Sequence, residues 1–384
     1  MDNEFSQSSM VLNVTLSKTE RQAQGIFFTP RKARNRLFGV LNDIDIDVTS
    51  ILEPSFGSGE FLIDAHEKYP KATLYGVELN KQLFESVPSS KTLYNMSFLD
   101  YKSDPVDLII GNPPYFSVKD KSPKCMTGHG NIYIQFLYKC LTEHLNPKGI
   151  LAFVLPTSLY NSSYYEPCRK YIANNTTIRH LETLNVNYYE TTQPTILIVI
   201  QNTISDSKPF VFERSGHTYI TPFYKELYDL VNNTTTIQAL GCSIKTGEVV
   251  WNQEKDKLAD TGTLIVYTTN IVDRKLVLDN LGKNKKQYIQ DFHKPPMVGP
   301  AIVVSRGYGN SYRFVFANIG AGVKFYGENH INVIYSKANT LTFRRNMKQI
   351  QKSFENEKSL KFIQYFVGNG ALSKTELETV FPIF

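Results

Sequence analysis

The chain lacks any long hydrophobic run and holds few cysteines, and each shortage excludes a class of protein. No apolar stretch approaches the ~20 residues that cross a bilayer, so we expect no membrane association. Residues 1–10 are polar and lean acidic, so we expect no secretion signal. The four cysteines stand apart without CxxC spacing, and no His or Cys cluster has the spacing of metal ligands. We therefore expect reduced thiols, a cytoplasmic location and no bound metal.

Charge is distributed unevenly along the 384 residues. Residues 201–384 carry 23 Lys and Arg against 16 Asp and Glu, whereas residues 1–200 carry 19 against 20. A basic module joined to a nearly neutral one is typical of proteins that grip a polyanion, although a solvated surface of modest charge gives the same count. The length suits two domains, and a hydrophobic fraction of 41% with 24 Phe and 23 Tyr supplies their cores.

Short apolar runs alternate with helical stretches over residues 51–154. Strand-like runs cover residues 49–52, 72–77, 92–95, 106–110 and 149–155. Residues 132–145 carry apolar side chains at helical spacing, and a further apolar run covers residues 195–200. Such alternation predicts an α/β fold with a mostly parallel sheet flanked by helices. Ligands of such folds bind at the carboxyl ends of the strands.

The stretch Asn112-Pro113-Pro114-Tyr115 directly follows one of these apolar runs. The side-chain carbonyl of Asn112 and the backbone carbonyl of Pro113 are two acceptors for the hydrogens of one NH2 group. Holding that amine draws its lone pair out of conjugation and aims it at a methyl donor. The prolines fix φ at about −65° and remove backbone hydrogen-bond donors. Tyr115 offers an aromatic face on which a flat base can stack. An ordinary turn is the alternative, because Asn-Pro and Pro-Pro are common turn dipeptides.

Two further features lie at the ends of predicted strands. Gly57-Ser58-Gly59 follows the first strand, where glycines let a ligand approach the backbone and the N-terminal N–H groups of a helix. Its spacing matches neither GxGxxG nor a phosphate-binding loop. Glu78 follows the second strand, where a carboxylate accepts both hydroxyls of a ribose. Taken singly, Glu78 also fits an exposed residue that ends a strand.

Five motifs occur in one order along the chain: GIFFTP at residues 25–30, EPSFGSG at 53–59, Glu78, SFLD at 97–100, and NPPY at 112–115. With this ordered set the chain resembles the gamma class of DNA adenine-N6 methyltransferases, closely over residues 20–200 and loosely beyond. The resemblance implies a Rossmann-like methyltransferase domain with a mostly parallel seven-stranded sheet, and then an α+β target-recognition domain. It also implies S-adenosyl-L-methionine as cofactor and double-stranded DNA as substrate. The expected parts are an N-terminal arm (1–24), a catalytic domain (25–205) and a DNA target-recognition domain (206–384).

The resemblance also implies cofactor contacts. They fall on Phe28, Thr29, Pro30, Glu53, Gly57, Gly59, Glu78, Ser97, Phe98, Asn112 and Pro114. The Phe-Thr-Pro segment would wrap the methionine end of the cofactor, Glu53 and the glycine turn its amino-acid part, and Glu78 its ribose. Phe98 matches an aromatic residue beside the cofactor adenine. The family places Asp before that aromatic, and Ser stands there in this chain, so either Ser97 or Asp100 contacts the adenine amine.

For catalysis, the resemblance points to Asn112, Pro113 and Tyr115. The target adenine would be flipped out of the duplex and held between Tyr115 and a second aromatic residue. Related enzymes place that aromatic shortly before the strand expected at 195–200, which indicates Tyr189, with Tyr188 as the alternative. In the basic second half we expect DNA contacts, most of them to phosphates, from Lys245, Lys285, Lys286, Arg306 and Arg313.

Two other kinds of methyltransferase are alternatives. A protein-glutamine N5 methyltransferase also uses Asn-Pro-Pro-Tyr, and so does an RNA adenine-N6 methyltransferase, but the Phe-Thr-Pro segment and the basic second half argue against both. A DNA-binding subunit without activity would show a damaged loop, and Asn112–Tyr115 is intact. We expect a DNA-associated monomer or weak dimer. No nuclease-like constellation occurs and the segment before Gln24 is short, so any cognate restriction endonuclease is expected to be a separate protein.

Overall fold

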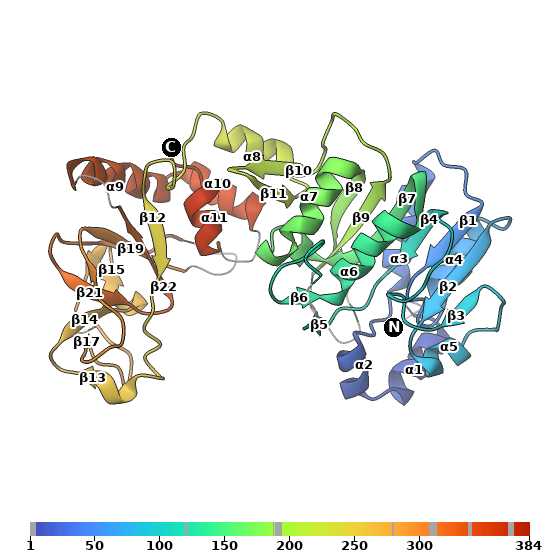
Figure 1. The fold of residues 1–384 in the computed structure, drawn as a ribbon, viewed down its shortest axis with the longest axis horizontal. Coiled ribbons are helices and arrows are strands. Elements are labelled where there is room, and N and C mark those ends of the chain that lie inside the picture. The colour runs from blue at the N-terminus through green and yellow to red at the C-terminus, as the bar shows by residue number, and fades with distance from the viewer. Residues whose placement is uncertain are drawn as a thin grey trace. The chain divides into compact units, whose positions relative to one another are not determined.

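Two compact units make up the chain, and they divide between Tyr224 and Lys225. The computed structural model describes residues 5–119, 122–186, 188, 194–278, 280–306, 313–336, 340–367 and 372–384. Figure 1 shows both units and labels most of their helices and strands. Each unit has a hydrophobic core of its own.

The boundary lies later than the start that we expected for the second domain, at residue 206. The intervening chain forms a hairpin of β10 (Val211–Arg214) and β11 (His217–Ile220), which belongs to unit 1. Val211 and Ile220 are buried in the same core as the central strands of that unit. Burial of its apolar residues therefore holds the hairpin to unit 1.

A seven-stranded sheet, in the order β3-β2-β1-β4-β7-β9-β8, forms the centre of the described part of unit 1. Its strands are β1 (Ser50–Glu53), β2 (Thr73–Glu78), β3 (Leu93–Asn95), β4 (Val106–Gly111), β7 (Leu145–Pro156), β8 (Thr177–Leu184) and β9 (Thr195–Gln201). Neighbouring strands pair in parallel except at β9, which runs antiparallel to both β7 and β8. The expected mostly parallel, seven-stranded sheet of a Rossmann-like domain is confirmed.

The central strands are apolar because helices cover both faces of the sheet. In β4, Ile109 packs into the core on one face, whereas Leu108 and Ile110 pack into the core on the other. The covering helices are α6 (Ile132–Lys139) and α7 (Glu166–Asn175) on the first face, and α3 (Arg31–Asn42) and α4 (Glu60–Lys68) on the second. Strands buried on both faces appear in a sequence as continuous apolar runs, which is why most of them were predictable.

The segment expected as an N-terminal arm folds onto unit 1. It forms α1 (Gln7–Thr15) and α2 (Lys18–Gln24). The backbone N–H of Ser6 and the hydroxyl of Ser9 each donate a 2.8 Å hydrogen bond to Glu60 Oε1. Because Glu60 begins α4 directly after the glycine turn, α1 is tied to that turn. The smaller elements of the unit are α5 (Lys81–Glu85), β5 (Ser117–Val118) and β6 (Gly130–Asn131).

The described part of unit 2 combines two larger sheets and a two-stranded ribbon with helices, which confirms the expected α+β fold. An antiparallel sheet, in the order β12-β22-β19-β20, contains β12 (Ser243–Thr246), β22 (Ile331–Tyr335), β19 (Ala301–Ser305) and β20 (Phe316–Ile319). A second sheet contains β13 (Leu258–Ala259), β17 (Tyr288–Ile289), β14 (Thr263–Val266), β21 (Lys324–Gly327) and β18 (Met297–Val298). A two-stranded ribbon pairs β15 (Ile271–Val272) with β16 (Lys275–Leu276). The helices are α8 (Tyr224–Val231), which begins at the boundary, α9 (Thr340–Phe354), α10 (Glu357–Phe366) and α11 (Lys374–Thr379).

Among the described residues, no helix has the length and apolar character that crossing a membrane requires. In the same part of the chain, His, Cys, Asp and Glu nowhere gather into a group of three that would hold a metal ion. All four cysteines are free and buried.

Asp107 ties the first residues of β1 to β4, and we expect its replacement to weaken the fold. Its Oδ2 accepts hydrogen bonds from the backbone N–H and hydroxyl groups of Thr49 and Ser50, and Oδ1 accepts one from Asn146. Burial alone would raise the pKa of Asp107, but these hydrogen bonds outweigh it and lower the pKa to about 2. A depressed carboxyl pKa stabilises the folded state above the unfolded-state pKa, and this stability is lost as the pH falls from about 4 to about 2.

Asp107→Asn should therefore lower the urea midpoint at pH 7, and the deficit should shrink as the pH falls through that window. Urea denaturation followed by circular dichroism at pH 7, 4 and 2.5 measures both effects. The exposed Asp47, on the loop before β1, supplies the control Asp47→Asn, which should leave the midpoint unchanged. Equal midpoints for Asp107→Asn and the native chain at pH 7 would contradict this role.

Candidate active site

The carboxyl ends of β1, β2 and β4 open on a cavity of about 340 Å³ in unit 1. The predicted site residues that line it are Phe28, Gly57, Glu78, Ser97, Phe98, Asn112 and Pro114. An adjoining pocket of about 40 Å³ is lined by Thr29 and Glu53 together with Phe28, Gly57 and Asn112. Segments far apart in the sequence therefore meet at one edge of the sheet, as a parallel sheet requires.

Pro30 and Gly59 line neither cavity. Pro30 is the N-cap residue of α3, and Gly59 is the N-cap residue of α4 with a left-handed φ of 78°. A Cβ atom at Gly59 would lie 2.9 Å from the Val87 side chain, so glycine suits this position. The structure gives both residues a place in the framework around the site, and their contact with a cofactor stays a prediction.

Gly57 and Glu78 form one wall of the cavity. The backbone N–H of Gly57 donates to Glu78 Oε2 at 2.9 Å, and the backbone N–H of Asn80 donates to Oε1 at 2.7 Å. Burial raises the pKa of Glu78, and the backbone hydrogen bonds oppose the rise. Each carboxylate oxygen still has a second lone pair for a ligand hydroxyl. Gly57 has a φ of 53° with no atom within 4 Å of its Cβ position, so a ligand can approach its backbone.

Glu53 is a buried carboxylate that lacks a full set of partners. Its side chain is at the end of β1, the residue is 2% exposed, and Oε2 has no hydrogen bond among the described residues. Burial raises the pKa of Glu53 well above its usual range, and the nearby charge of Glu78 raises it further. Buried acceptors in native proteins are almost always paired, so this oxygen indicates a place for a ligand donor.

Ser97 and Phe98 form the wall beyond β3. The Phe98 ring is buried and packs on Phe136 with a centroid distance of 4.9 Å. Ser97 lines the cavity, and its hydroxyl accepts a 3.2 Å hydrogen bond from the backbone N–H of Leu99. Asp100 is exposed and is not one of the lining residues. Of the two alternatives left open by the sequence, the structure places only Ser97 in the cavity wall.

The Asn112 amide is held from one side. Its Nδ2 donates to Thr29 Oγ1 at 3.0 Å and to the carbonyl of Phe27 at 3.3 Å. Its Oδ1 faces the other way and accepts a hydrogen bond from the Tyr115 hydroxyl. Pro113, between them in the chain, is buried. The acceptor predicted for a substrate amine is thus oriented, and in this structure it is bonded to Tyr115.

Tyr115 is packed among other aromatic residues. Its ring stacks on Phe27 with a centroid distance of 5.7 Å and meets the ring of Tyr133 edge-on at 5.9 Å. Its hydroxyl lies 2.8 Å from the carbonyl of Val154 as well as near Asn112. Burial raises the pKa of Tyr115 well above its usual range, with smaller contributions from Tyr188 and Tyr133. The hydroxyl is therefore neutral and acts as a hydrogen-bond donor.

Several wall residues were not singled out from the sequence. They are Ala23, Gln24, Leu79, Leu83, Phe116 and Ile132. Gln24, at the end of α2, accepts a 2.9 Å hydrogen bond from Asn80 Nδ2, which links the N-terminal helices to the residue beside Glu78. Gly25 has a φ of 64°, and a Cβ atom there would lie 2.6 Å from the backbone nitrogen of Tyr115. Gly25 stands out by its conformation. Nothing in the sequence spacing of the other six wall residues distinguishes them from ordinary core or surface positions.

Tyr189, predicted to stack on the target base, lies outside the described residues. Its alternative, Tyr188, is described. The Tyr188 hydroxyl is 2.8 Å from Thr195 Oγ1, and the ring packs against the core on the α3 and α4 face of the sheet. Burial raises the pKa of Tyr188 to about 12, so its hydroxyl is neutral.

Comparison with known proteins identifies the family. A family model described as the Eco57I restriction-modification methylase matches residues 55–188. Modification methylase CviBIII of Paramecium bursaria Chlorella virus NC1A is 30% identical to this chain over 99% of both proteins. The chain belongs to the Type II DNA modification methyltransferases. Type II methyltransferase M.CvrRI of Paramecium bursaria Chlorella virus XZ-6E is similar over the same extent, with 29% identity. The predicted site-specific DNA methyltransferase and its cofactor, S-adenosyl-L-methionine, are confirmed at the level of this family.

Two solved structures with a similar fold share less of the sequence of this methyltransferase. A Listeria monocytogenes protein assigned to the class I S-adenosylmethionine-dependent methyltransferases aligns over 53% of this chain and 68% of its own, with 18% identity and a TM-score of 0.43. The M protein of the Type I restriction enzyme EcoKI aligns over 46% of this chain and 44% of its own, with 15% identity and a TM-score of 0.38.

The basic residues predicted to contact DNA all lie in unit 2 of the methyltransferase, and several already have partners. Lys245 pairs with Glu248 at 2.8 Å, and Lys286 pairs with Asp260 at 3.1 Å. The remaining three are Lys285, whose ammonium lies 4.8 Å from the ring centroid of Tyr267, the half-buried Arg306, and the exposed Arg313. Exposed ion pairs are weak, so phosphates can displace these partners. Their contact with DNA stays a prediction.

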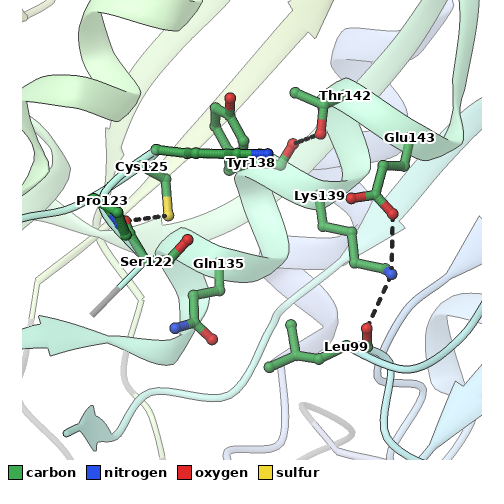
Figure 2. A pocket seen from close by; sticks show the side chains of 10 residues that line it. Leu99, Ser122, Pro123, Cys125, Gln135, Tyr138, Lys139, Thr142 and Glu143 are labelled. Atoms are coloured by element: carbon green, nitrogen blue, oxygen red, sulfur yellow. Dashed lines mark hydrogen bonds and ion pairs between the residues drawn. The ribbon is translucent and has the colours of Figure 1, made fainter. Parts of the chain in front are cut away.

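A second recess of the methyltransferase, of about 640 Å³, is larger but has fewer side chains suited to cofactor binding or catalysis (Figure 2). None of the predicted site residues lines it. Figure 2 shows Lys139 directed at the carbonyl of Leu99, to which it donates at 3.0 Å, and at Glu143, with which it pairs at 3.1 Å. Lys139 and Glu143 therefore satisfy each other, whereas the unpaired Glu53 oxygen and the oriented Asn112 amide belong to residues that line the pocket of about 40 Å³ beside the smaller cavity.

Proposed function

We propose that this DNA methyltransferase transfers the methyl group of S-adenosyl-L-methionine to N6 of an adenine in duplex DNA. The observation that carries the proposal is the Asn112 amide, whose oxygen is turned away from Thr29 by the two hydrogen bonds of Nδ2. With the Pro113 carbonyl, this oxygen supplies two acceptors for an exocyclic amine at the end of β4. Positioning of amine and methyl donor then accounts for much of the acceleration.

The residues around the cavity fit the cofactor. Bound there, the cofactor supplies an electrophilic methyl group on a sulfonium. We propose that the unpaired Glu53 oxygen accepts from its amino group, that Glu78 accepts from its ribose hydroxyls with the lone pairs left free by Gly57 and Asn80, and that Phe98 packs on its adenine. The predicted contacts of Phe28 and Pro114 are supported by their position in the wall.

The flipped base is proposed to stack on Tyr115. Stacking on an aromatic residue contributes ~1–3 kcal/mol per base, which offsets much of the few kcal/mol lost in flipping. The Asn112 oxygen accepts a hydrogen bond from the Tyr115 hydroxyl and has a second lone pair for the target amine. The second face is assigned to Tyr189, with Tyr188 as the alternative.

The reaction product tests this proposal. The purified chain is incubated with radiolabelled S-adenosyl-L-methionine and, in separate reactions, with duplex DNA, RNA and protein extract. DNA that takes up label is digested to nucleosides and analysed by mass spectrometry. We expect label in duplex DNA as N6-methyladenine. Label as N4-methylcytosine, or label only in RNA or on protein glutamine, would overturn the proposal.

Unit 2 is proposed to recognise the DNA target. Its net positive charge supports phosphate contacts through Lys245, Lys285, Lys286, Arg306 and Arg313. The logarithm of the DNA binding constant should therefore fall linearly with the logarithm of salt concentration, with a slope of roughly −0.9 per phosphate neutralised. Fluorescence anisotropy at salt concentrations from about 50 to about 300 mM measures this slope, and a flat response would contradict duplex binding.

We also propose that the protein is a monomer or weak dimer and that any cognate endonuclease is a separate protein.

A further inference from the structure

Thr29 contacts the candidate catalytic amide through its side chain. Its hydroxyl oxygen lies 3.0 Å from Asn112 Nδ2, although the two residues are 83 positions apart in the chain. The second Nδ2 hydrogen is directed at the Phe27 carbonyl, 3.3 Å away. A carbonyl only accepts hydrogen bonds, so an amide turned by 180° would bring two oxygens together there. The two bonds therefore favour a single orientation, in which Oδ1 accepts from the Tyr115 hydroxyl.

Thr29 is itself firmly placed, independently of its hydroxyl. The residue is 5% exposed, and its backbone carbonyl accepts a 2.7 Å hydrogen bond from Arg34 Nη1. The buried guanidinium of Arg34 is in turn paired with Glu60 at 2.9 Å and with Asp64 at 2.6 Å. The backbone of Thr29 is thus anchored to α3 and α4. Removing the hydroxyl should free the Asn112 amide without releasing the chain around it.

We propose that Thr29 is a positioning residue for methyl transfer, whose hydroxyl orients the Asn112 amide so that Oδ1 receives the target amine. This inference rests on the proposed role of Asn112. The resemblance to the family placed Thr29 among the cofactor contacts, whereas in the structure its side chain serves the amide. Donation from Nδ2 to two acceptors also polarises the amide and strengthens Oδ1 as an acceptor. The hydroxyl therefore acts on the rate of transfer more than on cofactor binding.

Thr29→Val, which keeps the shape and removes the hydroxyl, tests the inference. We expect kcat to fall by about 10- to 100-fold, the penalty typical of a misplaced reactive group. The cofactor dissociation constant should stay within about twofold, less than 0.5 kcal/mol. Thr29→Ser, which keeps the hydroxyl, should restore most of the lost rate. If Thr29→Val does not fold, Thr29→Ala, which also lacks the hydroxyl and adds no bulk, replaces it.

Thr176→Val is the matched control, because Thr176 is also buried in unit 1 and donates its hydroxyl to the Ile172 carbonyl at 2.7 Å. Thr176 is the C-cap residue of α7, a helix that does not line the cavity. This substitution should alter the melting temperature without altering kcat. An unchanged kcat in Thr29→Val, or a loss of cofactor affinity that accounts for its slower rate, would overturn the inference.

Asn112→Ala, assayed in parallel, separates this inference from the proposed function. If Asn112→Ala remains active, the proposed role of Asn112 is wrong and the inference falls with it. If Asn112→Ala is inactive while Thr29→Val matches the native rate, only the positioning role is wrong.

Discussion

Asn112→Ala is expected to reduce methyl transfer to DNA by at least about 10²- to 10³-fold, the loss typical when one preorganised polar group is removed from an active site. The substitution deletes the amide oxygen that receives the target amine and leaves only the Pro113 carbonyl. The walls formed by Glu53, Gly57 and Glu78 stay in place, so cofactor binding should be largely spared. Single-turnover transfer of a radiolabelled methyl group, together with calorimetric titration of the cofactor, measures the two quantities separately.

Two variants sharpen this experiment. Asn112→Asp keeps an acceptor but cannot donate to Thr29 and places a carboxylate against the Phe27 carbonyl, so we expect a rate between those of the native chain and Asn112→Ala. Asn202→Ala removes a side-chain amide that donates to two backbone carbonyls in unit 1, at Leu145 and Asn146, and it should leave the rate unchanged per folded molecule. Native transfer rates in Asn112→Ala would exclude the proposed role of Asn112.

Most of the sheet in unit 1 could be predicted from the sequence, because its central strands are buried on both faces. The runs at 106–110 and 195–200 match β4 and β9 within one residue at each end. The strand β8 was not predicted. It is at the edge of the sheet, where Arg179 and Glu182 are not buried, and these polar residues interrupt the apolar run that identifies a central strand.

The sequence also predicted that the site residues lie close together, because the carboxyl ends of parallel strands share one edge of the sheet. The hydrogen-bond partners of each side chain at that edge could not be predicted from the sequence. The contact of Thr29 with Asn112 spans 83 positions, and the hydroxyl of Tyr115 bonds to Asn112 instead of leaving its oxygen free. Local patterns identify residue types suited to a reaction, but these pairings depend on how the loops pack in three dimensions.

The boundary between the units shows a similar limit. The catalytic domain was expected to end at residue 205, but the polar segment at 202–208 is a surface loop that leads into the β10–β11 hairpin of unit 1. Loops at the surface and linkers between domains have the same composition, since both are solvated. Only the burial of Val211 and Ile220 after the loop shows that the chain returns to the core of unit 1.

Gly57→Ala is expected to weaken binding of S-adenosyl-L-methionine by roughly tenfold or more, equivalent to at least ~1.4 kcal/mol. Gly57 has a φ of 53°, and a left-handed conformation costs a residue with a Cβ atom ~1–2 kcal/mol. The Cβ position meets no protein atom within 4 Å and Gly57 lines the cavity, so we expect the added methyl group to compete with the ligand for space. Relaxation of the turn would also disturb the 2.9 Å hydrogen bond from Gly57 to Glu78. Isothermal titration calorimetry gives the cofactor dissociation constant directly.

Gly216→Ala separates backbone strain from occupation of the cavity. Gly216, in the turn of the β10–β11 hairpin, has a φ of 80° and likewise no atom within 4 Å of its Cβ position, but it does not line the cavity. Both substitutions therefore introduce comparable strain and should lower the melting temperature by similar amounts. Only Gly57→Ala should lose cofactor affinity, because only there does the methyl group compete with the ligand. Equal dissociation constants for the two variants would show that the glycine turn does not contact the cofactor, and the cofactor would then have to bind elsewhere along the carboxyl edge of the sheet.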